Sequence, residues 1–221
     1  MVDGHTPLWP LHEARMRLTA QACGFRLPRM EAPEEMCPAS MRRGFVKCRI
    51  IYRDEIENIT FDSYEPRKIA SLCCLPQPAI DYQWKKIKRD ALDTLRLGAD
   101  ADEVVMYNGE GLLTDTTYTN ILLEKEPGVW HMPRQPLLEG VMKSALWIAA
   151  GNAPATPLEE AAAAYYRTAP EAFPSIGPFE QIEKRDISLR ELAHYHRIAL
   201  INAMLPPEEA IILPLCSCRL S

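Results

Sequence analysis

The chain has 221 residues, of which 47% are hydrophobic and 25% are charged, and its formal net charge is −5 at pH 7. This length and composition fit one large domain or two small ones with a substantial core, and they argue against disordered, collagen-like and coiled-coil proteins. The acidic balance and the short, separate basic clusters argue against nucleic-acid or membrane partners. No apolar run is long enough to span a bilayer, and Met1–His5 lacks the features of a signal peptide. We therefore expect a cytoplasmic protein.

The seven cysteines are odd in number, and their spacing matches no zinc site. Cys73-Cys74 and Cys216-x-Cys218 are close in sequence and invite a metal or disulfide interpretation. Buried or half-buried thiols in a reducing compartment are the simpler explanation. We therefore predict no metal site.

The first third of the chain predicts a small α+β unit. A helix is expected from Leu11 to Gly24, where apolar residues recur at helical spacing and glycine ends the run. A proline-rich loop with a helical turn follows. Alternating β-branched and aromatic residues then predict strands, the first two forming a hairpin: residues 44–52, 56–64 and 68–75. Pro76-Gln77-Pro78 indicates a linker, so we place the domains at residues 1–77 and 78–221.

The second domain is predicted to be larger and rich in strands. Helices are expected at residues 90–98, closed by Gly98, and at residues 140–150. The predicted strands lie at 103–108, 111–114, 120–124, 129–132, 198–204 and 210–215. Ser188 and Glu191 form a capping-box pattern before a further helix that ends near His196.

Residues 152–181 stand apart because they are rich in proline and surround one alanine-rich helix, Leu158 to Arg167. This composition indicates an insertion into the larger domain. A surface excursion and an active-site lid are equally good interpretations of it.

Several weak motifs follow one another in a fixed order. His12-Glu13-Ala14-Arg15 comes first, then Lys85-Lys86-Ile87-Lys88-Arg89, then Asp115-Thr-Thr-Tyr-Thr-Asn120-Ile-Leu, then Gly140-Val141-Met142-Lys143, and finally Asn202-Ala203. In order and spacing these segments resemble the class IV aminotransferases, the fold-type IV pyridoxal-phosphate enzymes. That group includes branched-chain and D-amino-acid aminotransferases and 4-amino-4-deoxychorismate lyase. The resemblance covers most of the chain apart from the proline-rich segment.

The resemblance implies that pyridoxal 5′-phosphate is the cofactor and that Lys85 forms its Schiff base. Such a cofactor needs a lysine amine, a carboxylate at the pyridine nitrogen and a binding site for its phosphate. Lys85 matches the family lysine that precedes an arginine by four residues, here Arg89. Lys86 is the rival, and in an extended segment the two side chains point to opposite faces, so only one of them reaches the ring.

Asp115 matches the acidic residue that pairs with the pyridine nitrogen, where most of the family has glutamate. An Asx turn between strands is the alternative explanation for this aspartate. Asn120 is expected to orient its neighbours rather than to touch the cofactor.

The remaining matches concern the cofactor phosphate. Arg15 matches an arginine that contacts it, a role that suits the planar guanidinium. The backbone N–H groups of Val141 and Met142 are expected to hold the phosphate at a helix N-terminus. Asn202 and Ala203 match a later segment on the phosphate side. Lys143 stands where the family usually has arginine, and Met142 resembles the lyase version of this turn more than the aminotransferase version.

The implied fold is a two-domain α+β arrangement like that of D-amino-acid aminotransferase, with the cofactor between the domains and two copies forming a homodimer. The implied activity is transamination of an amino-acid-like substrate. The alternatives are elimination of pyruvate from 4-amino-4-deoxychorismate and a non-catalytic relative that keeps the fold. The family usually has a first strand before the His-x-x-Arg helix, and the sequence from Met1 lacks the Phe-Glu-Thr-like pattern of that strand.

Overall fold

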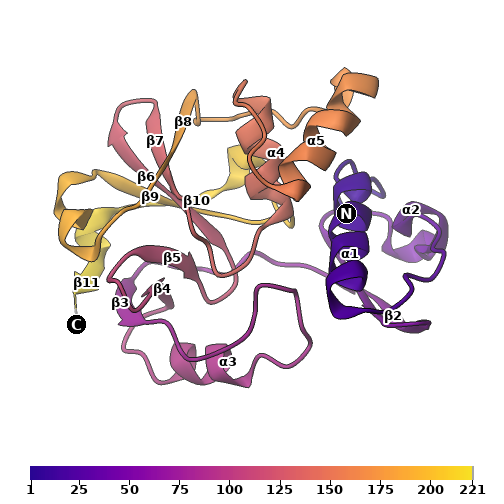
Figure 1. The fold of residues 1–221 in the computed structure, drawn as a ribbon, viewed down its shortest axis with the longest axis horizontal. Helices are drawn as coiled ribbons and strands as arrows, with labels where there is room; N and C mark the ends of the chain where they lie inside the picture. The colour runs from indigo at the N-terminus through magenta and orange to yellow at the C-terminus, as the bar shows by residue number, and fades with distance from the viewer. Residues whose placement is uncertain (221) are drawn as a thin grey trace.

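The computed structural model describes residues 1–220, and Figure 1 shows a small group of N-terminal elements beside two larger sheets. The small group contains helix α1 (Trp9–Cys23), the short helix α2 (Pro33–Met36) and the strands β1 (Val46–Tyr52) and β2 (Ile56–Ser63). The two strands pair antiparallel, as the alternating sequence predicts. Gly24 ends α1 in the left-handed conformation, with a φ of 71°, which glycine adopts without steric cost. The helix and the hairpin are therefore confirmed.

The chain before α1 runs along the edge of the hairpin. Val2 forms an antiparallel bridge with Phe45, and the Asp3 amide donates a hydrogen bond of 3.0 Å to the Gly44 carbonyl.

Strand β3 (Leu72–Pro76) corrects one prediction, because it does not join the hairpin. It pairs parallel with β4 (Glu103–Tyr107) in a four-stranded sheet of order β11-β3-β4-β5, together with β5 (Leu113–Thr116) and β11 (Cys218–Leu220). Helix α3 (Asp90–Leu97) lies below this sheet in Figure 1. The expected third strand of the small unit thus pairs in a different sheet from the hairpin, while the domain boundary at residue 77 stays a prediction.

The second sheet has five strands in the order β10-β9-β6-β7-β8. All of its pairs are antiparallel except β7 with β8. Strand β6 is central and almost wholly buried, which agrees with its continuous apolar run. Its strands are β6 (Asn120–Glu126), β7 (Val129–Pro133), β8 (Gln181–Arg185), β9 (Arg197–Ile201) and β10 (Ile211–Pro214).

The proline-rich segment contributes its helix to the core. Its helix α5 (Pro157–Thr168) packs in one hydrophobic core with α1 and with α4 (Val141–Ala149). Leu158, Ala162 and Tyr166 are buried there, and Trp130 Nε1 donates to the Pro178 carbonyl at 3.1 Å. The helix of this segment is therefore part of the core, beside α4 in Figure 1, while the role of residues 152–181 as a whole stays a prediction.

The segment that follows Ser188 forms a capping box as predicted, but it continues as a 3₁₀ helix, Leu189–His194. Among the described residues no helix is both long and apolar enough to cross a membrane.

Candidate active site

Lys85 lies in the irregular segment between β3 and α3. Lys85 is an exposed residue by its surface area, like Lys86, although protein atoms surround its amine. Burial and, to a smaller extent, the nearby positive charges of Arg15 and Arg89 together lower the pKa of Lys85 to about 8, whereas Asp115 acts in the opposite direction. Residues that are far apart in sequence therefore share one electrostatic environment around this amine.

Lys86, the rival lysine, has a different environment. Its Nζ forms an ion pair with Asp81, and about 41% of its side chain is exposed. The structure thus separates the two neighbouring lysines, with Lys85 close to the other predicted site residues and Lys86 in a surface pair.

Asp115 lies on β5 and is buried, with 4% of its surface exposed. Asn120 Nδ2 donates to its Oδ1 at 2.7 Å, and the Leu138 backbone N–H donates to its Oδ2 at 2.9 Å. Burial raises the pKa of Asp115 to about 7, although these two hydrogen bonds and the charge of Lys143 oppose the shift. Both carboxylate oxygens are therefore held in place, in surroundings that favour a nearby positive charge.

Asn120 also contacts the turn before α4. Its Nδ2 donates to the Leu138 carbonyl at 3.0 Å, and a Cβ built on Gly140 would lie 1.8 Å from Asn120 Oδ1. Only glycine fits at position 140, because any side chain would displace the amide that holds Asp115. The orienting role expected of Asn120 agrees with this geometry.

The N-terminus of α4 begins at Val141, with Gly140 as the N-cap residue and no side-chain cap. A helix leaves its first N–H groups without partners inside the helix, so this end can bind an anion. Val141 and Met142 are both buried. Met142 and Asn202 line one small recess, in which Asn202 Oδ1 accepts a hydrogen bond of 2.8 Å from the Met204 amide. The half-buried Ala203 packs against the same core.

Arg15 is half-buried on α1, and burial lowers its pKa while Tyr52 and Tyr82 act in the opposite direction. His12 lies one turn earlier. Burial lowers the pKa of His12 to about 3, and the charges of Arg15 and Lys85 add to this shift, so the imidazole is neutral. Sequence reasoning omitted His12 from the site, although its spacing of three from Arg15 places both on one helix face. No local signal indicated Tyr52 or Tyr82.

Arg89 ties the Lys85 segment to the loop after β5. Its Nη2 donates to the Thr117 carbonyl at 3.0 Å, and it forms a 3.1 Å ion pair with Asp93 in the first turn of α3. Arg89 is therefore placed to hold the loop that carries the lysine.

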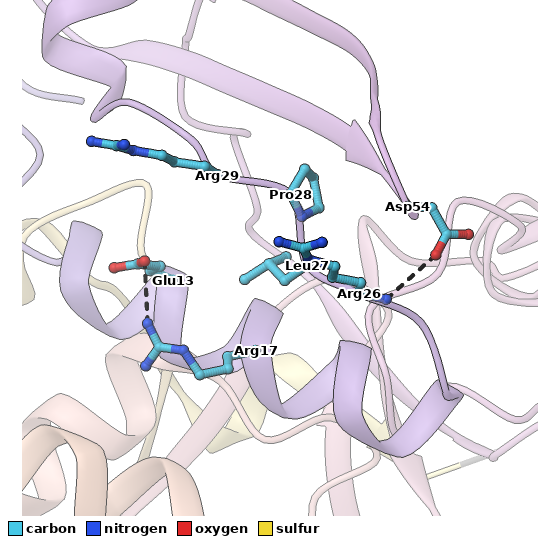
Figure 2. A pocket seen from close by; sticks show the side chains of 7 residues that line it. All are labelled: Glu13, Arg17, Arg26, Leu27, Pro28, Arg29 and Asp54. Carbon is cyan, nitrogen blue, oxygen red and sulfur yellow. Dashed lines mark hydrogen bonds and ion pairs between the residues drawn. The ribbon is translucent and has the colours of Figure 1, made fainter.

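A separate hollow lies on the small unit, between α1, the loop after it and the turn of the hairpin (Figure 2). Glu13 and Arg17 form a 3.2 Å ion pair there, and the Arg26 amide donates to Asp54 at 3.4 Å. None of the predicted site residues lines this hollow.

The residues around Lys85 fit pyridoxal phosphate by their chemistry. An amine of lowered pKa, an anchored carboxylate, a guanidinium and a helix N-terminus are the groups that such a cofactor requires. The anchored Asp115 is the most telling member of this set, because a buried carboxylate needs a positively charged partner to stay ionised.

No protein-family model matches the chain. An uncharacterised protein of Haemophilus influenzae is 22% identical over 167 residues, which cover 76% of this chain and 72% of that protein. Solved structures are similar over most of the chain. A protein described as a candidate 4-amino-4-deoxychorismate lyase from Haemophilus somnus superposes with a TM-score of 0.67 at 21% identity, covering 92% of each chain. A hypothetical aminotransferase from Mycobacterium tuberculosis, in its PLP-bound form, gives a TM-score of 0.59 at 14% identity, covering 91% of this chain and 74% of that one.

The fold is therefore that of the fold-type IV pyridoxal-phosphate enzymes, the two-domain α+β architecture that the ordered motifs predicted.

Proposed function

We propose that this protein is a pyridoxal-phosphate-dependent enzyme that acts on the amino group of an amino-acid-like substrate, with transamination as its reaction. The observation that carries the proposal is the anchored carboxylate of Asp115 near enough to Lys85 to act on its charge. Thirty residues separate them in sequence, yet the carboxylate influences the amine from a position fixed by two hydrogen bonds. The fold of known cofactor-dependent enzymes supports the same conclusion.

Each residue has a distinct task in this proposal. Lys85, with a pKa of about 8, supplies a partly neutral amine near neutral pH, which would condense with the cofactor aldehyde with loss of water and would later carry a proton at Nζ. Asp115 holds a proton on the pyridine nitrogen. Arg15 and the N–H groups of Val141 and Met142 bind the phosphate, with Asn202 and Ala203 beside them. When bound, the cofactor supplies an electron sink for a carbanion.

Elimination of pyruvate from 4-amino-4-deoxychorismate is the second candidate. Met142 in the phosphate turn favours it, as does similarity to structures described as such lyases, among them one from Pseudomonas aeruginosa with a TM-score of 0.58 at 17% identity. The same lysine serves both reactions, so substrate contacts decide between them.

We also propose that the protein works as a homodimer. Ile87 and Leu97 are large apolar side chains with 69% and 72% of their surface exposed. Ile87 lies in the segment that carries Lys85, and Leu97 is the last residue of α3. Contact with a second copy of the chain would remove these two side chains from water. Light scattering of the purified protein tests this proposal, and a monomer would contradict it.

The activity is tested with cofactor-loaded protein under two conditions. An amino donor with a 2-oxo acid acceptor should give a new amino acid at a rate that Lys85→Ala abolishes and Lys86→Ala leaves within about twofold. Pyruvate release from aminodeoxychorismate without any acceptor would instead select the lyase. If neither reaction exceeds the rate of Lys85→Ala, the protein is a non-catalytic relative and the proposal fails.

A further inference from the structure

Four charged side chains meet beside the site, and two of them are buried. Lys143 is 1% exposed and Glu159 is fully buried. Lys143 Nζ lies 2.8 Å from Glu139 Oε1 and 3.8 Å from Glu159 Oε1, and Lys184 Nζ pairs with the same oxygen of Glu159. Two positive and two negative charges thus form one compact, neutral cluster.

The cluster joins three elements to the turn before α4. Glu139 and Lys143 flank Gly140-Val141-Met142, while Ser144 Oγ donates to Glu139 Oε1 at 3.2 Å. Glu159 comes from the first turn of α5, where its Oε2 also accepts the Ala155 amide at 2.9 Å. Lys184 belongs to β8. Through Glu159, the proline-rich segment therefore takes part in the ion-pair cluster that is connected to the proposed phosphate site.

Burial explains why such a cluster fixes geometry. Charged groups inside a protein are stable only when their partners are well placed, so the partners hold one another in position. Lys143 is the member shared by Glu139 and Glu159, because its ammonium lies within ion-pair distance of both. Its position on the first turn of α4 transmits that constraint to the preceding N–H groups.

We propose that Lys143 is a positioning residue, which Glu139 of the turn and Glu159 of α5 hold so that the N-terminus of α4 keeps the geometry that binds a phosphate group. This inference rests on the proposed function and adds a role for α5 to it. Lys143 does not touch the ligand in this account, because its ammonium is occupied by the two carboxylates.

The test compares two probes of the apoprotein, pyridoxal phosphate and pyridoxal, which differ only in the phosphate. Dissociation constants are measured from the visible absorption of the bound aldehyde. The variants are Lys143→Met, Glu159→Gln and, as a control outside the cluster, the half-buried Lys125→Met. We expect Lys143→Met to raise the dissociation constant of pyridoxal phosphate about tenfold, equivalent to about 1.4 kcal/mol. The constant for pyridoxal should change less than twofold. The ratio of the two dissociation constants, pyridoxal phosphate to pyridoxal, should rise about threefold in Glu159→Gln. Lys125→Met should leave this ratio unchanged.

The outcomes separate this inference from the proposed function. If both probes weaken equally, or if neither does, Lys143 has no role specific to the phosphate and the inference fails while the cofactor proposal stands. If the wild-type protein binds neither probe, the cofactor proposal fails and this inference fails with it. If Lys143→Met shows no cooperative unfolding transition, the ratio for the near-isosteric Glu159→Gln decides.

Discussion

Asn120 donates its side-chain amide to Asp115 Oδ1 at 2.7 Å, and the same nitrogen reaches the Leu138 carbonyl at 3.0 Å. One amide therefore links β5, where Asp115 lies, to the turn that begins α4. Both ends of the proposed cofactor site, the carboxylate for the ring and the turn for the phosphate, depend on this side chain.

Asn120→Ala should destabilise the fold by about 1–3 kcal/mol, because it leaves a buried carboxylate oxygen and a carbonyl without their donor. Urea unfolding of the apoprotein measures the loss. Asn58→Ala, at an exposed position on β2, is the matched control and should change stability by less than about 0.5 kcal/mol. Equal stability of the two variants would show that the Asn120 bonds contribute nothing.

Gly140→Ala should cost about 1–3 kcal/mol and weaken cofactor binding, because the new Cβ would stand 1.8 Å from Asn120 Oδ1 and displace it. Gly109→Ala is the control, since no atom lies within 4 Å of a Cβ there. Thermal unfolding and absorption titration of both variants check this. A Gly140→Ala protein that behaves like Gly109→Ala would contradict the close contact.

Lys85 should be the lysine that reacts first with an amine acylating reagent at pH 8. Burial and the charges of Arg15 and Arg89 lower its pKa to about 8, so about half of it is neutral there, while ordinary lysines near 10.4 remain protonated. The rate at which Lys85 is acylated, measured by peptide mapping after brief labelling at several pH values, should level off above about pH 8. Arg15→Met should move the inflection to higher pH, and an unchanged profile would contradict the assigned cause.

Asp115 should give the apoprotein stability that is lost as the pH rises from about 4 to about 7, whereas His12, with its pKa lowered to about 3, acts in the opposite direction over this range. Burial raises the folded-state pKa of Asp115 to about 7, so in this range the folded state binds the proton more tightly than the unfolded chain does. The stabilising contribution of Asp115 is therefore complete below about pH 4 and is lost as the pH rises to about 7. Denaturant unfolding at several pH values should show that the stability of wild type, measured relative to Asp115→Asn, falls across this range, because His12 is common to both proteins. Parallel curves would refute the raised pKa.

Local patterns predicted the local elements. The helix ended by Gly24, the hairpin of β1 and β2 and the central strand β6 follow from periodicity and turn residues, and the structure confirms them. The site residues were located through the resemblance, because no single motif was specific. The structure adds the electrostatic contact between Lys85 and Asp115, while their roles remain predictions.

The sequence alone did not predict which strands and charged residues pair when they are far apart along the chain. Strand β3 reads like a third hairpin strand, yet its partner is β4, since pairing is decided by the whole sheet. The proline content of residues 152–181 suggested an exposed segment, but the apolar face of α5 packs against α1 and α4. Strand β8 alternates too weakly to be recognised, and it is held by parallel pairing with β7. The ion pair of Lys143 with Glu159 joins residues of two helices, and only the fold shows that these two charges meet in the interior.

The central claim is that Lys85 bonds to the cofactor aldehyde. The most direct measurement is borohydride reduction of the protein after addition of pyridoxal phosphate and dialysis, followed by peptide mapping of the label. The account predicts that a visible absorption band disappears on reduction and that the label lies on Lys85, with little on the ion-paired Lys86. The absence of a band, or a label spread over Lys86 and other surface lysines, would contradict it.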